Sequence, residues 1–297
     1  MNNSGGLPFT VDGLLPDLDS PVLITQFAGW IDASGAAASA MELLISESHS
    51  KRLITFDADT FIDYRARRPV MELRDGVNTN IEWNVPEIRV GRDANGRDVL
   101  LLTGPEPDMA WNFFARTVGE LAQQMKVKKM VGLGAYPFGA PHTRPVGITA
   151  TSADPSVIDR LDLSRSTLDA PAGVQSILEH TLMKSGIEAV SLWAQVPHYV
   201  ASMAYPLASD ALVQALCADN GLHFDSSRLR RESAVQRERL DQLVANNPEH
   251  AGMLQQLESA YDETHGAPLS DNTADIPSVD ELAAEVEQFL RDQQLGE

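Results

Sequence analysis

The sequence has a single cysteine, Cys217, among its 297 residues. One cysteine forms neither an intramolecular disulfide nor a cysteine-based metal site. Residues 1–20 contain no basic segment followed by a long apolar stretch, so we expect no signal peptide. No window approaches the roughly 18 consecutive apolar residues of a membrane-spanning helix, so we expect no membrane partner. These absences predict a soluble, cytoplasmic protein.

Basic residues are also scarce. The chain has 23 Lys and Arg against 42 Asp and Glu, which gives a formal net charge of −19 at pH 7. Such a surface repels the phosphates of nucleic acids and of anionic membranes, so we expect neither as a partner. The acidic excess is uneven, because residues 264–297 carry eight acidic residues and one basic residue, a net of −7.

Known catalytic and metal-binding motifs are missing as well. The seven histidines follow neither the HxH nor the HExxH spacing, so we predict no metal site and no cofactor. No GxSxG nucleophile motif is found. A chain of this length nevertheless buries roughly 75% of its unfolded surface, which is enough for a large core without metals or disulfides.

What the sequence does contain is an alternation of apolar, strand-like runs with helix-like segments. This pattern indicates an α/β protein whose mostly parallel sheet is covered by helices on both faces. The expected strands are 22–27, 53–56, 129–134, 146–151 and 187–197, and the expected helices are 33–46, 109–125, 152–161, 170–186, 206–221, 226–245 and 250–261.

Two further segments are predicted to form hairpins. Asn95-Gly96 lies between two strand-like runs in EIRVGRDANGRDVLLLTG, and this dipeptide favours a type I′ turn. Residues 57–83 contain a proline, an Asp75-Gly76 turn and alternating side chains, which indicates a hairpin or an excursion. The two hairpins add an antiparallel part to the predicted fold.

The stretch VLITQFAGWIDASGAAASAMELL (22–44) combines a strand, a glycine turn and a helix, as many phosphate-binding sites do. It contains no basic residue and matches neither the GxGxxG nor the Walker pattern. Asp32 lies where its carboxylate satisfies the N-terminus of the following helix. We therefore expect Gly29 and Asp32 to turn the chain and cap the helix. The alternative is a polar ligand site at the carboxyl end of the strand.

A second candidate is Glu106 in TGPEPDMAW (103–111), between a strand and a helix. It is interpreted either as a general base or as a partner of the helix dipole in the first helical turn. Asp108 is the expected N-cap of the helix at 109–125.

The loop GLGAYPFGAPHTRPVG (132–147) contains Tyr136, His142, Thr143 and Arg144. Histidine is suited to act as a base and arginine to hold an anion. This is the best-equipped loop in the chain for a small anionic ligand. The alternative is a contact between subunits of an oligomer.

Two other segments are candidates for binding surfaces. Pro197 and Tyr199, in AQVPHYVASMAYP (194–206), follow a strand end and indicate either a binding surface or a packed crossover. The arginine-rich run RLRRESAVQRERL (228–240) is interpreted as a solvated helix face. Docking of an acidic partner, or of the chain's own acidic tail, is its alternative.

Several of these pieces resemble the proteasome assembly chaperone 2 family, in its actinobacterial branch. They include FAGWIDASGAAASAMELL, LLLTGPEPDMAW, VGLGAYPFGAPHTRPVGITATS, GVQSILEHTLMKSGIEAVSLWAQVPHYV and LVANNPEHAGMLQQLESAYDE, and the resemblance covers most of residues 21–263. It implies a three-layer α/β/α sandwich similar to purine nucleoside phosphorylases, homo-oligomers, and relatives that help to assemble proteasome α-rings. The final residues, Gln294 to Glu297, do not form the hydrophobic–Tyr–any motif with which eukaryotic members insert into ring pockets.

Four regions are expected along the chain. They are an N-terminal arm at 1–20, an α/β/α core at 21–225, a helical pair at 226–263 and an acidic, flexible tail at 264–297. Within the tail, residues 265–277 are expected to be a linker and residues 279–294 a short amphipathic helix or disordered.

The expected function is that of a non-catalytic, oligomeric protein of the assembly-chaperone kind. Its expected partners are itself, as a trimer, and proteasome subunits or another protein. The alternative is an enzyme or binding protein for a nucleoside-like or other small anionic ligand. In that alternative, Asp32 or Glu106 holds a hydroxyl or acts as base, and Arg144 holds the anion.

Overall fold

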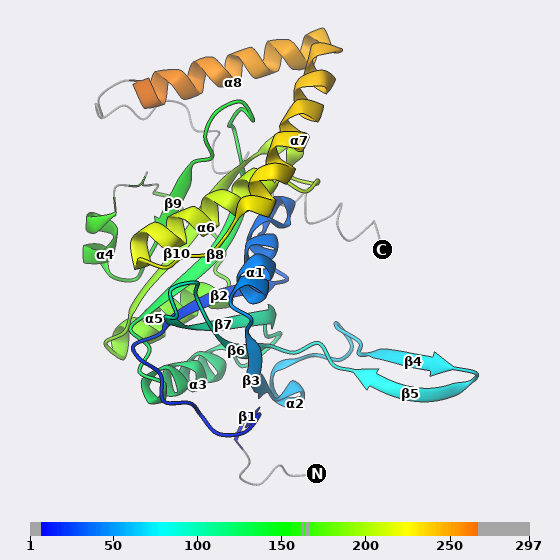
Figure 1. Cartoon of the computed structure of the whole chain (residues 1–297), viewed down its shortest axis with the longest axis vertical. Coiled ribbons are helices and arrows are strands. Elements are labelled where there is room, and N and C mark those ends of the chain that lie inside the picture. Colours follow the sequence, from blue (N-terminus) through cyan, green and yellow to red (C-terminus); the bar gives the residue numbers. More distant parts are fainter. Residues whose placement is uncertain (1–6, 162, 164, 166, 267–297) are drawn as a thin grey trace.

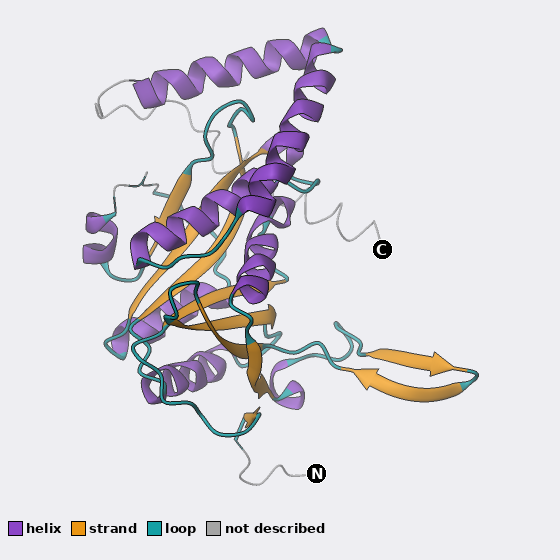
Figure 2. Cartoon of the chain, viewed as in Figure 1, coloured by secondary structure: helices purple, strands orange, loops and turns teal. Residues whose placement is uncertain are grey.

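The computed structural model describes residues 7–266 except 162, 164 and 166. Its centre is an eight-stranded mixed β-sheet with helices on both faces (Figures 1 and 2), so the predicted α/β/α sandwich is confirmed. The strand order is β1-β3-β6-β7-β2-β8-β10-β9. The strands are β1 (Phe9–Val11), β2 (Val22–Ala28), β3 (Lys51–Phe56), β6 (Glu87–Arg92), β7 (Asp98–Pro105), β8 (Lys129–Phe138), β9 (Ile148–Thr151) and β10 (Glu188–Pro197).

The middle of the sheet is parallel. β7, β2, β8 and β10 are neighbours that run in one direction. β3 shares this direction because β6 pairs antiparallel with both β3 and β7, whereas β1, β6 and β9 run the other way. The carboxyl ends of β2, β7, β8 and β10 therefore meet at one edge of the sheet, where open α/β sheets bind their ligands.

Different helices cover the two faces of the sheet. The helices of the core are α1 (Ala36–Glu47), α2 (Ala58–Phe61), α3 (Trp111–Gln124), α4 (Pro155–Arg160), α5 (Val174–Lys184) and α6 (Pro206–Asn220), with 3₁₀ turns η1 (Ala33–Gly35) and η2 (His198–Val200). In β2, Ile24 packs with α1 and α6, Leu23 packs with α3 and α5, and neither residue is more than 1% exposed. Burial on both sides explains why the central strands are continuous apolar runs.

The predicted excursion at 57–83 forms a separate two-stranded hairpin, β4 (Val70–Arg74) and β5 (Val77–Glu82). It projects away from the rest of the molecule (Figure 1). The predicted turn is confirmed, because Asp75 and Gly76 both have positive φ, 49° and 81°.

The hairpin of β6 and β7 is also confirmed, but its predicted type I′ turn is wrong. Gly96 has a φ of 80°, whereas Asn95 is not in the positive-φ region that such a turn requires. The Asp93 carboxylate accepts hydrogen bonds from the backbone N–H groups of Asn95 and Arg97, at 2.9 and 2.8 Å. A side-chain acceptor therefore organises a longer loop than the two-residue turn predicted from the dipeptide.

The start of α3 differs from the prediction as well. The helix begins at Trp111, after Ala110, and no side chain caps it. Asp108 instead accepts a hydrogen bond from the Asp63 backbone N–H at 2.9 Å and pairs with Arg67 at 3.2 Å. The segment that leads to the β4–β5 hairpin thus takes the carboxylate that we expected to cap α3.

Two long helices follow the core. α7 (Ser227–Ala245) packs against α6, and α8 (Pro248–Gly266) crosses the far end of α7 (Figure 1). The prediction of a linker from residue 265 is wrong for residues 265 and 266, since α8 continues through Gly266. The remainder of the predicted acidic tail, including the segment 279–294, lies outside the described residues. Among the described helices, none combines the length and the apolar character needed to cross a bilayer.

Candidate functional site

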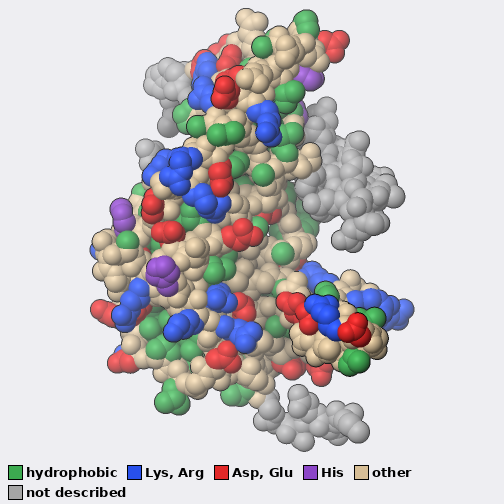
Figure 3. Space-filling model, turned by 45° about the vertical axis from the view of Figure 1, so that its right-hand side comes forward, with side chains coloured by type: hydrophobic (Ala, Val, Ile, Leu, Met, Phe, Trp, Pro, Cys, Tyr) green, Lys and Arg blue, Asp and Glu red, His purple; other side chains and the backbone are tan. Residues whose placement is uncertain are grey.

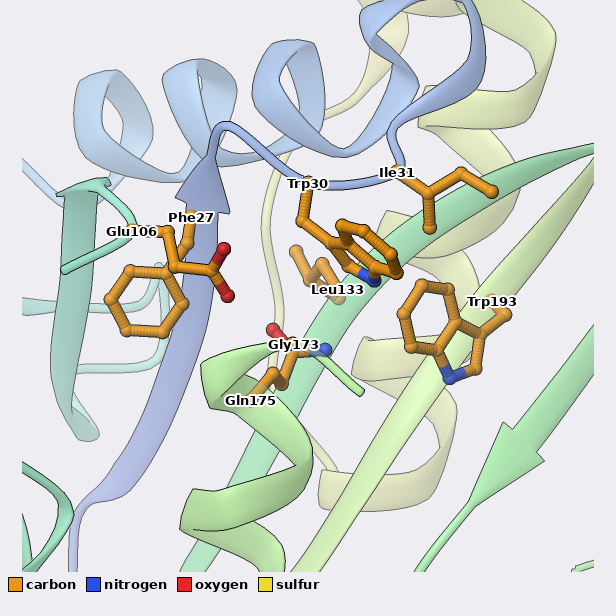
Figure 4. Close-up of a pocket in the computed structure, with 8 residues that line it drawn as sticks. All are labelled: Phe27, Trp30, Ile31, Glu106, Leu133, Gly173, Gln175 and Trp193. Carbon is orange, nitrogen blue, oxygen red and sulfur yellow. The ribbon is translucent and has the colours of Figure 1, made fainter. Parts of the chain in front are cut away.

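A small pocket opens at the edge where the parallel strands end. It is a shallow hollow whose total space of about 280 Å³ includes open solvent, and its room for a water-sized molecule is only about 20 Å³. Figure 4 shows that its walls come from β2, β8, β10, the loop after β7 and the start of α5. The lining residues are Phe27, Trp30, Ile31, Glu106, Leu133, Gly173, Gln175 and Trp193.

Two glycines leave the space that the two tryptophan side chains of the pocket occupy. A Cβ atom on Gly134 would lie 2.3 Å from the indole ring of Trp193, so this ring lies flat against the backbone of β8. A Cβ atom on Gly173 would lie 2.9 Å from Trp30 Cδ1 and 3.0 Å from Glu106 Oε1. Any larger residue at either glycine would displace a wall of the pocket.

Glu106 is the one carboxylate among the residues that line this pocket. The Val174 backbone N–H, in the first turn of α5, donates to its Oε1 at 2.6 Å. Glu106 is 7% exposed, and burial raises its pKa, against the lowering effects of the Val174 hydrogen bond and of Arg67. The predicted helix-dipole role is therefore present, but Glu106 serves α5 rather than the helix that follows it in the sequence.

Arg67 holds this edge together. Its Nη1 donates to the Glu106 backbone oxygen at 2.8 Å, and its Nε pairs with Asp108. Gly29, with a φ of 109°, lies directly beneath this guanidinium, because a Cβ there would lie 2.8 Å from Arg67 Nη2. Gly29 thus permits a close approach to the backbone, and the group that approaches is the side chain of Arg67.

Asp32 caps the first helix, as predicted. Its two carboxylate oxygens accept hydrogen bonds from the backbone N–H groups of Ala37 and Ala38, at 2.8 and 2.9 Å. Burial raises the pKa of Asp32 to about 6, while the hydrogen bonds from α1 lower it. Asp32 does not line the pocket, so the structure does not bring it together with Glu106 around one ligand.

The helix starts at this edge are consequently poor sites for an anion. Free N–H groups at a helix N-terminus attract phosphates and carboxylates. Here Asp32 occupies the start of α1, and Glu106 occupies the start of α5. Two fixed negative charges replace the anion that the alternative hypothesis placed at this edge.

Arg144 is not available to hold an anion at this edge either. Its Nε and Nη2 donate to both carboxylate oxygens of Asp262 in α8, at 2.8 and 2.7 Å, and its Nη1 donates to Glu258 at 3.2 Å. Thr143 also donates to Glu258. The predicted anion-binding group is thus engaged in holding α8 against the loop at 139–147, so the structure differs from that prediction.

His142 and Tyr199 are brought together by the same loop. The His142 backbone N–H donates to the Tyr199 hydroxyl, which also lies 2.7 Å from Nδ1 of the His142 ring. Nε2 of His142 lies 3.1 Å from Asp241 in α7, and the imidazole is 1% exposed. Because a carboxylate only accepts, Nε2 carries the proton that faces Asp241. Burial raises the pKa of Tyr199 to about 12, which keeps its hydroxyl protonated.

The remaining candidates lie on β8 and β10. β8 extends beyond its predicted end, because it pairs with β10 as far as Phe138 and Pro197. Tyr136 is therefore in a strand rather than in a loop, and its hydroxyl accepts a hydrogen bond from Gln195 at 3.0 Å. Pro197 is buried at the end of its strand, as expected of a packed crossover.

Most of the residues that line the pocket were not predicted from the sequence. Trp30 carried a usable signal, since it follows the predicted strand 22–27 by three residues, whereas Trp193 lies in the middle of the predicted strand 187–197. Gln175 and Arg67 carried none, because the tertiary structure brings them to this edge from distant segments. Among the described residues, no group of three or more histidine, cysteine, aspartate or glutamate side chains is arranged to hold a metal ion.

Comparison with known proteins places the chain among relatives. It matches the model of the PAC2 family over residues 26–244, which confirms the resemblance found in the sequence. No curated protein matches the chain significantly.

Three solved structures are informative. A Corynebacterium glutamicum protein of unknown function is 28% identical, with a TM-score of 0.79 over 86% of this chain and 97% of that chain. A Mycobacterium tuberculosis protein of unknown function is 30% identical, with a TM-score of 0.79 over 90% of this chain and 93% of that chain. A Mycobacterium tuberculosis proteasome-assembly chaperone homologue is 28% identical, with a TM-score of 0.72 over 78% of this chain and 99% of that chain.

The buried Asp32 carboxylate makes a prediction about pH. Its pKa rises from 3.8 to about 6 on folding, so the folded chain keeps a proton that the unfolded chain releases. We expect the free energy of unfolding of the wild type, minus that of Asp32→Asn, to fall by about 2 kcal/mol between pH 4 and 7. Urea unfolding at intervals across this range measures the difference.

Asp154→Asn is the matched control. Asp154 caps α4 and is partly exposed, and its hydrogen bonds from Ser156 lower its pKa. The corresponding difference is expected to stay constant between about pH 5 and 7 and to shrink only below about pH 4. A constant or rising difference for Asp32 between pH 4 and 7 would contradict the effect of burial.

The contacts of Arg144 make a prediction about α8. Arg144→Ala removes the hydrogen bonds to Asp262 and Glu258, which join the loop at 139–147 to α8. We expect backbone amides of α8 to exchange hydrogen about three- to tenfold faster, with α6 unchanged. Hydrogen-exchange mass spectrometry measures both. Arg228→Ala, which removes an exposed pair within α7, is expected to leave α8 unaffected. Equal exchange in α8 of wild type and Arg144→Ala would refute the role of Arg144.

Proposed function

The chain belongs to the PAC2 family, and we propose that it acts as a non-catalytic, chaperone-like protein that binds other protein chains. Proteasome subunits are the first candidate partners. The similarity to the mycobacterial proteasome-assembly chaperone homologue supports this choice, since this chain covers 99% of that structure at 28% identity. We further propose that it acts in the cytoplasm.

The β4–β5 hairpin is the observation that carries the proposal. Every residue of both strands is exposed, and large apolar side chains lie on the hairpin and beside it. Figure 3 shows the hairpin standing out from the surface with apolar side chains among its charged ones. The exposed apolar residues are Val70, Met71, Leu73, Val77, Ile81 and Trp83.

Such a hairpin is suited to binding protein. An isolated two-stranded hairpin is marginally stable in water, and this one forms a sheet of its own that is not hydrogen-bonded to the central sheet. Met71 and Ile81 lie opposite each other in the register, so their side chains share one face. Contact with another chain would bury this face and stabilise the hairpin.

We propose that one partner of the hairpin is a second copy of the chain, in a homo-oligomer that is a trimer. The phosphorylase-like fold supports the trimer by analogy. The alternative of a small anionic ligand receives no support from the strand-end edge, because Asp32 and Glu106 occupy the helix starts there and Arg144 is paired with α8.

The proposed partner is tested directly by co-purification. The tagged full-length protein is mixed with purified α- and β-subunits of the proteasome of the same organism, and complexes are separated by size. We expect α-subunits to elute with the protein and to assemble into rings faster in its presence. Elution of every subunit separately, with unchanged ring assembly, would reject proteasome subunits as the partner.

Self-association is tested on the hairpin. We expect light scattering to give a mass near three times the chain mass of 32.3 kDa for the wild type. Met71→Asp with Ile81→Asp is expected to lower this mass, with an unchanged unfolding temperature of the core, because the hairpin projects away from it. Asn80→Ala, on the opposite face of β5, is the control and is expected to keep the wild-type mass. A monomeric wild type would contradict the proposed oligomer.

A further inference from the structure

We propose that the strand-end pocket binds a guanidinium group, such as the side-chain end of an arginine. The proposal rests on the proposed function in one respect, since a partner protein is the expected source of that arginine. The pocket itself is defined by Glu106, Trp30, Trp193 and Gln175.

The Glu106 carboxylate has one oxygen engaged and one open to the pocket. Oε1 accepts the hydrogen bond from Val174. Oε2 is not among the described buried atoms that lack a hydrogen-bond partner, so a donor that enters the pocket can reach it. Figure 4 shows the carboxylate pointing toward Trp30, with Trp193 beyond it. A carboxylate that is 7% exposed and keeps one oxygen open to the pocket favours a ligand that donates a hydrogen bond and carries positive charge.

Two walls of the pocket are aromatic and suit a cation. Trp30 and Trp193 both line the pocket, and the faces of indole rings attract cations more strongly than those of other aromatic side chains. Trp193 is held by Gly134 beneath it and by the hydrogen bond that its Nε1 donates to Thr151 at 3.0 Å. The wall is therefore rigid before any ligand arrives, which lowers the entropic cost of binding.

The net charge of the side chains around Glu106 favours a cation. Arg67 is the cation beside Glu106, and it is already engaged with the Glu106 backbone oxygen and with the Asp108 carboxylate. These three side chains carry a net charge of −1. The start of α5 is occupied by Glu106, so its N–H groups attract no second anion there. A cation therefore fits this edge, and an anion does not.

The size of the hollow limits what it can hold. Its space of about 280 Å³ includes open solvent and its room for a water-sized molecule is about 20 Å³, so it takes the end of one side chain at its mouth and cannot enclose a nucleoside. A guanidinium is flat, stacks on aromatic faces and is more weakly hydrated than an ammonium. It offers several N–H groups, one for Glu106 Oε2 and another for the Gln175 side-chain amide. We therefore infer a guanidinium in preference to the ammonium of lysine.

The test uses the full-length protein and tryptophan fluorescence, because two of its four tryptophans line the pocket. The probe is N-acetyl-arginine amide, and the matched control is N-acetyl-citrulline amide, which has the same shape without the charge. We expect a saturable change with a Kd on the order of 1 mM for the arginine compound. The citrulline compound is expected to bind at least about tenfold more weakly. Equal binding of the two, or no saturation by the arginine compound, would overturn the proposal.

Variants locate the binding. Glu106→Gln keeps an acceptor for Val174 and removes the charge, and it is expected to weaken arginine binding about tenfold. Trp193→Leu is a second variant that leaves the helix start untouched, and it is expected to weaken binding as well. Asp32→Asn, at the same edge but outside the pocket, is the control and is expected to bind as the wild type does. Unchanged binding by folded Glu106→Gln and Trp193→Leu would reject this pocket as the site.

The source of the arginine is a separate question with its own measurement. If a partner supplies it, Glu106→Gln reduces co-purification of the proteasome subunit that binds the wild type. If free guanidinium compounds are the ligands, the same variant loses the arginine compound and keeps the subunit. Binding of the arginine compound by a wild type that recovers no subunit would contradict the proposed partner and leave the pocket's specificity standing. Recovery of a subunit by a wild type that does not bind the arginine compound would contradict the proposed pocket ligand and support the proposed partner.

Discussion

Two buried carboxylates at the starts of two helices set the character of the strand-end edge. The central strands are covered on both faces, so the helices that pack on them begin at this edge with N–H groups that need acceptors. Asp32 supplies the acceptors for α1, and Glu106 supplies one for α5. A phosphorylase-like sheet therefore ends in fixed negative charge, where many related folds present free helix starts to an anion.

This constraint also explains the surroundings of the pocket. Glu106 must stay close to the start of α5, and Arg67 keeps it there by binding its backbone oxygen and Asp108. Glycines at positions 29 and 173 leave room for Arg67 and Trp30 beside this arrangement. The segment that carries Arg67 continues into the β4–β5 hairpin, so the element that closes the edge also carries the exposed apolar surface.

The C-terminal helices depend on a different set of contacts. The loop between β8 and β9 presents His142, Thr143 and Arg144, and each of them contacts α7 or α8. These side chains were predicted from the sequence to bind an anionic ligand, but in the structure they hold two helices in place. A sequence pattern reports which chemistry a loop can perform, whereas the neighbouring elements decide which chemistry is already satisfied.

The sequence by itself determined the elements and their order, because apolar periodicity, glycine ends and turn residues act locally. It predicted the strands of the sheet other than β1, which lies in the expected N-terminal arm, together with the Asp75-Gly76 turn, the capping role of Asp32 and the family. Only the tertiary structure decided the partners of Glu106, Asp108 and Arg144, since those contacts join segments 39 to 118 residues apart. It also decided that Trp30, Gln175 and Trp193 share one pocket, because parallel pairing aligns strand ends that are distant in the chain.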